Sequence, residues 1–111
     1  MDKCDYVLID DDPIIHASWT FVAKSKGKVV RCYAKANEFI QEIGMYHKET
    51  PIYIDSNLGE NVRGEIVAKN IHEKGFENIY LATGYNPEEF TQMPWIKAVV
   101  GKEPPFLFER L

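Results

Sequence analysis

Short apolar runs alternate along this chain with segments that carry helix signals, and this alternation restricts the fold more strongly than any other feature. Such runs are typical of strands buried inside a parallel sheet. Strands joined by helical crossovers form parallel sheets, and right-handed crossovers with one reversal of direction give the strand order 2-1-3-4-5. The predicted strands are Tyr6–Asp10, Val29–Tyr33, Ile52–Asp55, Ile79–Thr83 and Ala98–Gly101.

The first crossover carries the clearest helix signals. Asp12 is suited to cap a helix that begins at Pro13, because its side chain accepts a hydrogen bond from a free amide and proline fits the first turn. Gly27 is predicted to end this helix. The residues predicted to face the core are Ile15, Trp19 and Val22.

The later crossovers predict two more full helices and a short fourth one. Asn37 is the predicted cap of the second helix, and the third covers Gly64–Lys74 and stops at Gly75. The fourth falls within Asn86–Pro94 and is short, because proline interrupts a helix. The residues predicted to face the core are Phe39, Ile40 and Ile43 in the second helix, and Ile66, Val67 and Ile71 in the third.

Length and composition predict a single cytoplasmic domain over residues 1–111. The net charge of −4, without a basic stripe, argues against direct nucleic-acid binding. No apolar run approaches the roughly 20 residues of a membrane helix, and the start of the chain lacks the apolar core of a signal peptide. Cys4 and Cys32 form neither a disulfide framework nor a metal-ligand cluster, which suits a reducing compartment.

Acidic residues, a hydroxyl and a lysine follow the ends of the predicted strands. In the predicted order the first and third strands are neighbours at the switch point, where open α/β sheets build their sites. Asp10 and Asp11, after the first strand, are therefore expected to meet Asp55, at the end of the third. Thr83 ends the fourth strand, and Lys102 follows the fifth.

This set of side chains suits phosphoryl transfer. Clustered carboxylates repel one another unless a cation lies among them, and an all-oxygen site favours Mg²⁺. Asp55 has the central position of a carboxylate nucleophile, and Thr83 and Lys102 are placed to stabilise the transferred oxygens. Taken singly, each residue has an ordinary structural explanation, as Asp12 does as a helix cap, so only the combination indicates a site.

The same residues stand in motifs that resemble the receiver domain of two-component response regulators, and the resemblance covers the whole chain. Residues 8–13 are similar to the first strand and acidic pair of that family, and Asp55 matches its phospho-accepting aspartate. Residues 56–59 are similar to its metal-side loop, residues 82–84 match its hydroxyl motif, and residues 101–106 match its lysine–proline motif. The resemblance implies a flavodoxin-like (CheY-like) sheet with helices on both faces.

The resemblance also implies a function. Asp55 would take a phosphoryl group from a phosphohistidine, and the domain would catalyse its own phosphorylation and dephosphorylation. Mg²⁺ would be held by Asp11, Asp55 and the backbone carbonyl of Asn57, with Asp10 acting through a water molecule. Asn57 and Tyr85 would tune the lifetime of the acyl phosphate. The implied partner is a histidine kinase or a histidine phosphotransferase, in cis or in trans.

Four features depart from the family pattern. The Thr83–Lys102 interval is short, so the fourth helix is expected to be short, and Val99 stands in place of the aromatic switch residue. Glu103 separates Lys102 from the proline, and the chain ends at Leu111, so the fifth helix is expected to be missing or truncated. By analogy, these departures suggest the receiver of a hybrid sensor histidine kinase, monomeric and without direct membrane contact.

Two alternative functions stay open at the level of sequence. A phosphatase of the haloacid-dehalogenase type would use Asp10 as nucleophile and Asp12 as general acid, and would leave Asp55 without a role. A pseudo-receiver would be an interaction module with an intact but unused site. It would bind its partner equally well after the substitution Asp55→Asn.

Overall fold

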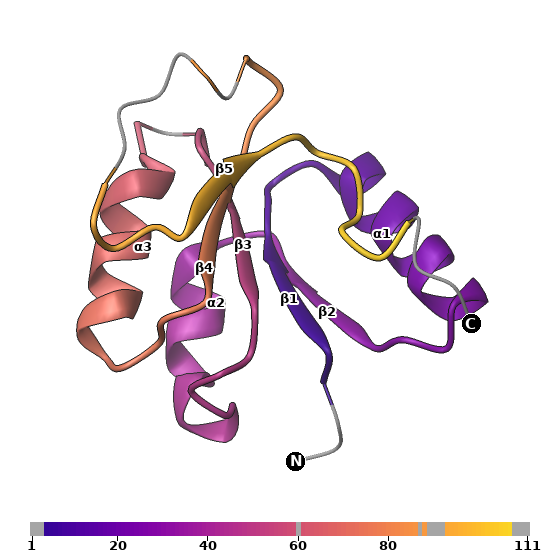
Figure 1. Cartoon of the computed structure of the whole chain (residues 1–111), viewed down its shortest axis with the longest axis horizontal. Helices are drawn as coiled ribbons and strands as arrows, with labels where there is room; N and C mark the ends of the chain where they lie inside the picture. Colours follow the sequence, from indigo (N-terminus) through magenta and orange to yellow (C-terminus); the bar gives the residue numbers. More distant parts are fainter. Residues whose placement is uncertain (1–3, 60, 87, 89–92, 108–111) are drawn as a thin grey trace.

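A five-stranded parallel sheet forms the centre of the computed structural model, which describes residues 4–59, 61–86, 88 and 93–107. The strand order is β2-β1-β3-β4-β5, which confirms the order predicted from the crossover rule. Every neighbouring pair of strands is parallel (Figure 1). The strands are β1 (Tyr6–Ile9), β2 (Val30–Tyr33), β3 (Ile52–Asp55), β4 (Ile79–Ala82) and β5 (Ala98–Val100).

Helices cover both faces of this sheet, as expected for a flavodoxin-like fold. Helix α1 (Pro13–Ser25) packs on one face, and α2 (Ala36–Gln41) and α3 (Gly64–Glu73) pack on the other (Figure 1). A short 3-10 helix, η1 (Ile43–Met45), follows α2. Within the described residues, no helix combines the length and the apolar character needed to cross a membrane.

The start and the end of α1 follow the signals in the sequence. The side chain of Asp12 accepts a hydrogen bond from the backbone N–H of Ile14 at 2.9 Å. After the last turn, Gly27 has φ +68°, a left-handed conformation that glycine adopts without strain. The inner face of α1 joins a group of side chains that we call the α1 core. Its buried members are Leu8, Trp19, Ala23, Tyr53 and Phe106.

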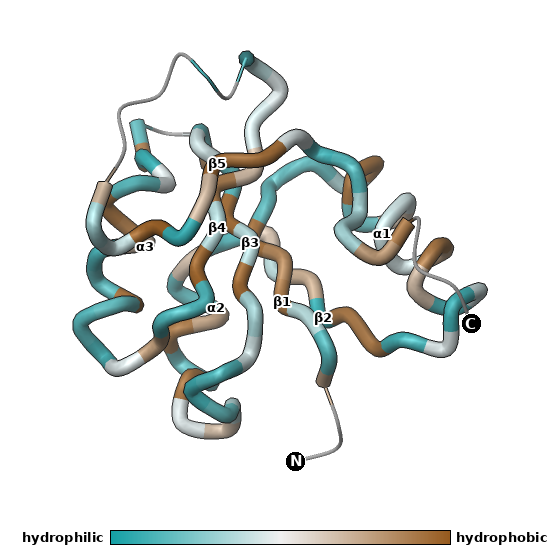
Figure 2. The backbone as a smooth tube through the Cα atoms, viewed as in Figure 1, coloured by the Kyte–Doolittle hydropathy of each residue, from teal (hydrophilic) through white to brown (hydrophobic). Residues whose placement is uncertain are grey.

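The other face of the sheet packs against α2 and α3. Side chains alternate along β1, so Val7 and Ile9 face α2 and α3 while Leu8 faces α1. All three are fully buried, which explains why this strand forms a continuous apolar run. Figure 2 shows that hydrophobic stretches gather in the sheet, whereas the outer turns of α3 are hydrophilic.

The predicted cap of α2 is wrong. The helix begins before Asn37, and its N-cap is Lys35. The side chain of Glu38 accepts a hydrogen bond from the backbone N–H of Lys35 at 3.1 Å. A glutamate inside the first turn therefore satisfies a free amide that the prediction assigned to a polar cap.

The predicted burial of Ile66 in α3 is also wrong, because this side chain is 65% exposed. Ile71 is buried and Val67 is partly buried, as expected. Residue 66 lies about 200° around the helix from residue 64, so the two positions face opposite ways. The residues on the buried stripe are Gly64, Ala68 and Ile71.

The segments around β5 are described only in part. The predicted fourth helix falls within residues 86–94, of which 87 and 89–92 lie outside the described residues. After β5, residues 101–107 contain no helix. Residues 108–111, which also bear on the expectation that the fifth helix is missing or truncated, lie outside the described residues. Val99, which stands in place of the aromatic switch residue, lies in β5 and packs against the α2–α3 side of the core.

Candidate functional site

Three carboxylates meet where β1 and β3 end. Asp10 follows β1 and is fully buried, whereas Asp55 is the last residue of β3 and is 7% exposed. Asp11 is exposed. One carboxylate oxygen from each residue lies within 4.8 Å of the other two. The switch point between β1 and β3 therefore brings together the acidic side chains that the sequence placed there.

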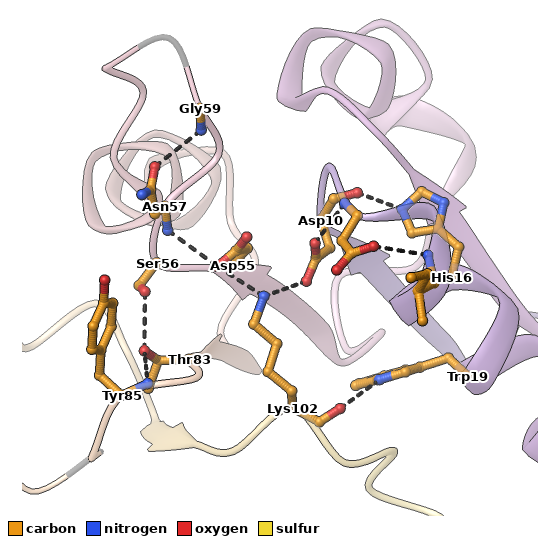
Figure 3. Close-up of polar contacts among 12 residues, drawn as sticks. Asp10, His16, Trp19, Asp55, Ser56, Asn57, Gly59, Thr83, Tyr85 and Lys102 are labelled. Carbon is orange, nitrogen blue, oxygen red and sulfur yellow. Dashed lines mark hydrogen bonds and ion pairs between the residues drawn. The ribbon is translucent and has the colours of Figure 1, made fainter.

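Lys102 carries a positive charge into this acidic cluster. Its Nζ donates to Asp10 Oδ2 at 2.6 Å and lies 3.0 Å from Asp55 Oδ1 (Figure 3). The lysine side chain is only 23% exposed, so it is not a solvated surface lysine. Its ammonium offsets part of the repulsion between the two buried carboxylates.

Burial and charge act in opposite directions on the two central groups. Burial raises the pKa of the Asp55 carboxyl, and the nearby Asp10 adds to the rise, although the Asn57 amide and the Lys102 ammonium oppose it. For Lys102, burial alone would lower the pKa, but the bonds to Asp10 and Asp55 outweigh burial and raise it. Asp55 is therefore costly to ionise in the metal-free protein, while Lys102 stays protonated.

The raised pKa of Asp55 makes the stability of the metal-free protein depend on pH. Because the folded protein holds this proton more tightly than the unfolded chain, the free energy of unfolding falls as the pH rises through the interval between the two pKa values. We expect Asp55→Asn to raise the melting temperature near neutral pH without divalent cations. The gain should vanish below the ordinary pKa of 3.8, where Asp55 is protonated in both states.

Asp12→Asn is the matched control for this thermal comparison. Asp12 is exposed and caps α1, and asparagine caps helices about as well as aspartate, so its melting temperature should stay near wild type. A lower melting temperature for Asp55→Asn at neutral pH would show that the ion pair with Lys102 outweighs the cost of burying Asp55.

The loop after β3 supports Asp55 and comes close to Asp11. The backbone N–H of Asn57 donates to Asp55 Oδ1 at 3.1 Å, and the side chain of Asn57 accepts from the N–H of Gly59 at 3.1 Å. Gly59 has φ +77°, and a Cβ there would lie 3.0 Å from Asp11 Oδ2. Glycine thus lets the loop turn beside the acidic cluster.

Helix α3 begins in direct contact with the backbone of Asp55. The N–H of Gly64 donates to the carbonyl oxygen of Ser56 at 3.1 Å. A Cβ at position 64 would lie only 2.1 Å from the carbonyl oxygen of Asp55 and 2.9 Å from its carbonyl carbon. Only glycine allows α3 to hold the end of β3 this closely.

Gly64→Ala should therefore destabilise the protein and displace Asp55. We expect the free energy of unfolding to fall by about 1–3 kcal/mol, the usual cost of adding a methyl group to a packed site, as measured by urea denaturation. Gly44→Ala is the control, because a Cβ there meets no atom within 4 Å and should leave stability unchanged or slightly higher. Equal stability of Gly64→Ala and wild type would contradict the close packing.

Thr83 directly follows β4 and is 1% exposed. Its Oγ1 accepts hydrogen bonds from Ser56 Oγ at 3.2 Å and from the backbone N–H of Tyr85 at 3.0 Å (Figure 3). A threonine hydroxyl has two lone pairs and one proton, so these bonds leave the proton to be donated. Thr83 is connected to the end of β3 through Ser56, the residue next to Asp55.

Three contacts of the site were not predicted from the sequence. Ser56 bonds Thr83, the His16 ring hydrogen-bonds the carbonyl oxygen of Asp10, and the Trp19 indole N–H donates to the carbonyl oxygen of Lys102 at 2.9 Å. The only sequence signal was the general rule that a buried tryptophan finds an acceptor for its N–H. The helical spacing of Trp19 predicted packing alone.

The acidic cluster fits a magnesium ion. Its donors are carboxylate oxygens, the ligands that Mg²⁺ prefers. Three ionised carboxylates leave two negative charges after Lys102 has compensated one. Two oxygens bound to one Mg²⁺ at about 2.1 Å lie at most about 4.2 Å apart, so a small movement of the exposed Asp11 side chain would complete the set.

Comparisons with known proteins identify structures with a similar fold. No protein-family model and no curated protein matches the sequence. Among solved structures, the receiver domain of the TMAO respiratory system response regulator TorR matches with a TM-score of 0.71 at 19% identity, over 94% of this chain and 88% of that chain. The N-terminal domain of a response regulator/sensory box/GGDEF 3-domain protein from Carboxydothermus hydrogenoformans matches with a TM-score of 0.70 at 16% identity, over 87% of this chain and 80% of that one.

Proposed function

We propose that this chain, which has the fold of response-regulator receiver domains, accepts a phosphoryl group on Asp55 in a Mg²⁺-dependent reaction. The observation that carries the proposal is the position of Lys102, whose Nζ bridges Asp10 and Asp55 beside the cluster of three carboxylates. A fold alone does not define a function, so this arrangement of side chains is the stronger support.

The geometry favours Asp55 over Asp10 as the nucleophile. Asp10 is fully buried, its Oδ1 accepts from the backbone N–H of Asp12 at 2.9 Å, and its Oδ2 accepts from Lys102. In Asp55 the bonds from Asn57 and Lys102 both go to Oδ1, so among the described residues Oδ2 has no donor. The phosphatase interpretation, with Asp10 as nucleophile and Asp12 as acid, also conflicts with the capping role of Asp12.

The transfer that we propose breaks one bond and forms one. Oδ2 of Asp55 attacks the phosphorus of a phosphohistidine whose other ring nitrogen carries a proton. The P–N bond breaks, and the ring leaves as neutral imidazole with the electron pair of that bond. Lys102 moves its ammonium from the carboxylates toward the phosphoryl oxygens, and the Thr83 hydroxyl donates a hydrogen bond to one of them while keeping its proton. Asn57 and Tyr85, which are both exposed, would control the access of water to the acyl phosphate.

Asp11, Asp55 and the backbone carbonyl of Asn57 would hold Mg²⁺, with Asp10 contributing through a bound water. When bound, the ion supplies positive charge that offsets the carboxylates and the incoming phosphoryl oxygens. The role of this chain is to keep Asp55 at the rim of the sheet, with Lys102 held at its side.

The partner that we propose is a histidine kinase or a histidine phosphotransferase, in cis or in trans. The start of α1 near Ile15 and the Pro104–Pro105 segment are the surfaces where that partner would dock. A cytoplasmic location agrees with the two cysteines, which are free thiols on opposite faces of the sheet: Cys4 packs on the α2–α3 side and Cys32 on the α1 core.

Intact mass spectrometry tests the proposal. The protein is incubated with phosphoramidate, which carries a P–N bond like that of phosphohistidine, in the presence of Mg²⁺ or of a chelator. We expect one phosphoryl adduct with Mg²⁺ and none with the chelator. A folded protein that binds Mg²⁺ but takes up no phosphoryl group would favour the pseudo-receiver, an interaction module that does not depend on phosphorylation.

A further inference from the structure

The active-site lysine is attached to α1 by a hydrogen bond that spans most of the chain. The indole N–H of Trp19 donates to the backbone carbonyl of Lys102 at 2.9 Å, across 83 residues of sequence (Figure 3). The segment after β5 that carries Lys102 contains no helix or strand within residues 101–107. Contacts from outside the segment must therefore fix where the lysine backbone lies.

Trp19 is itself rigidly held. Its side chain is fully buried in the α1 core. The indole packs edge-on against Phe106 at 5.8 Å and an interplanar angle of 88°, and against Tyr53 at 5.3 Å and 64°. Phe106 belongs to the same segment as Lys102, so Trp19 holds this segment by one polar contact and one ring contact.

The position of the Lys102 backbone decides where its ammonium can reach. Nζ bonds Asp10 at 2.6 Å and Asp55 at 3.0 Å, on the ends of two neighbouring strands. A flexible lysine contacts two carboxylates at once only if its backbone is fixed. If the backbone moves, the side chain spreads over many conformations, and few of them place Nζ between both carboxylates.

We propose that Trp19 is a positioning residue for Lys102: its indole N–H fixes the lysine backbone so that the ammonium bridges Asp10 and Asp55. The proposal deepens the proposed function, on which its consequence for phosphoryl transfer rests. Loss of this hydrogen bond lets Lys102 leave the carboxylates, which has two opposite consequences. Phosphoryl transfer becomes slower, whereas Mg²⁺ binding becomes tighter, because the competing ammonium spends less time at Asp10 and Asp55.

Trp19→Phe and Trp95→Phe form a matched pair for the test. Phenylalanine keeps an aromatic ring but removes the indole N–H. Trp95 also donates its indole N–H to a backbone carbonyl, that of Glu65 at 3.0 Å, but this carbonyl belongs to α3 and not to the segment that carries Lys102. Each substitution is also combined with Lys102→Ala in a double-mutant cycle.

Three measurements are made on each variant: the free energy of unfolding in urea, the Mg²⁺ affinity by calorimetry without phosphodonor, and the rate of phosphorylation by phosphoramidate. We expect Trp19→Phe to tighten Mg²⁺ binding in the direction of Lys102→Ala and to slow phosphorylation roughly twofold to twelvefold, the equivalent of one net hydrogen bond. Trp19→Phe should lower the free energy of unfolding by less in the Lys102→Ala background than in the wild-type protein. Trp95→Phe should leave Mg²⁺ affinity and rate unchanged and be additive with Lys102→Ala.

Additive effects of Trp19→Phe and Lys102→Ala on the free energy of unfolding would overturn the proposal, since this cycle needs neither metal nor donor. Weaker Mg²⁺ binding in Trp19→Phe would also overturn it, because it would indicate a generally loosened site. If the wild-type protein takes up no phosphoryl group at all, the proposed function fails, while the unfolding cycle and the Mg²⁺ affinities still decide the role of Trp19.

Discussion

Asp55→Asn should abolish the Mg²⁺-dependent phosphoryl adduct while leaving the protein folded. Asparagine keeps the shape of the side chain and can accept the one hydrogen bond from the Asn57 backbone amide, but a neutral amide oxygen is a far weaker nucleophile than a carboxylate. The measurement is intact mass after incubation with phosphoramidate and Mg²⁺, together with a urea unfolding curve. The expected result is complete loss of the adduct in a cooperatively folded variant.

Asp12→Asn is the control for this experiment as well. Asp12 lies two residues from Asp10, is exposed, and serves as the cap of α1. The Asp12→Asn variant should therefore be phosphorylated like the wild-type protein. An adduct that persists in Asp55→Asn but disappears in Asp10→Asn would instead support the phosphatase-type mechanism, in which Asp10 is the nucleophile.

Lys102→Ala should reduce the rate of phosphorylation by about 10²–10³-fold, the usual cost of removing one hydrogen-bond donor that stabilises a transition state. The same variant should bind Mg²⁺ more tightly, since its ammonium no longer occupies Asp10 and Asp55. Without Mg²⁺ it should be less stable, because the fully buried Asp10 loses its cationic partner. Breaking a fully buried ion pair costs about 3–5 kcal/mol of the free energy of unfolding. The loss in Lys102→Ala should be smaller, because the Lys102 side chain is 23% exposed.

Lys97→Ala is the matched control for Lys102→Ala. The ammonium of Lys97 also donates a hydrogen bond, to Asn78 Oδ1 at 3.0 Å, but in an exposed position away from the carboxylates. Its rate and its Mg²⁺ affinity should equal those of wild type. Phosphorylation of Lys102→Ala at the wild-type rate would rule out the role that we assign to this lysine.

The sheet and the strand-end residues could be predicted because local patterns and general chirality rules determine them. Each strand is an apolar run with its own boundaries, and the right-handed crossover leaves few possible orders. Once β1 and β3 are neighbours, Asp10 and Asp55 must lie at the same edge of the sheet. The acidic cluster therefore follows from the order of the strands alone.

The details that were wrong depend on contacts that local patterns do not contain. The start of α2 depends on one hydrogen bond that the Glu38 side chain accepts from the backbone N–H of Lys35, and the exposure of Ile66 depends on which side of α3 meets the sheet. In a helical pattern, Asn37 fits either as the cap or as a residue inside α2, and Ile66 fits either on the buried or on the exposed side of α3. Only the packing of the whole domain selects one of them.

The most important contacts of the site lie far apart in sequence and were not predictable as pairs. Lys102 bonds Asp10 across 92 residues, and Trp19 reaches the Lys102 carbonyl across 83. The residue types were visible in the sequence, but the partner of each side chain depends on its rotamer and on the path of the loop after β5. The double contact of Lys102 could be seen only in the assembled structure.

The residue that carries the phosphoryl group decides whether Asp55 is the phosphoryl acceptor. The protein is phosphorylated with phosphoramidate and Mg²⁺, the acyl phosphate is reduced with borohydride, and the modified residue is identified by proteolysis and tandem mass spectrometry. We expect modification of Asp55 alone. Modification of Asp10 or Asp11, or a folded Mg²⁺-bound protein with no modified residue, would contradict it.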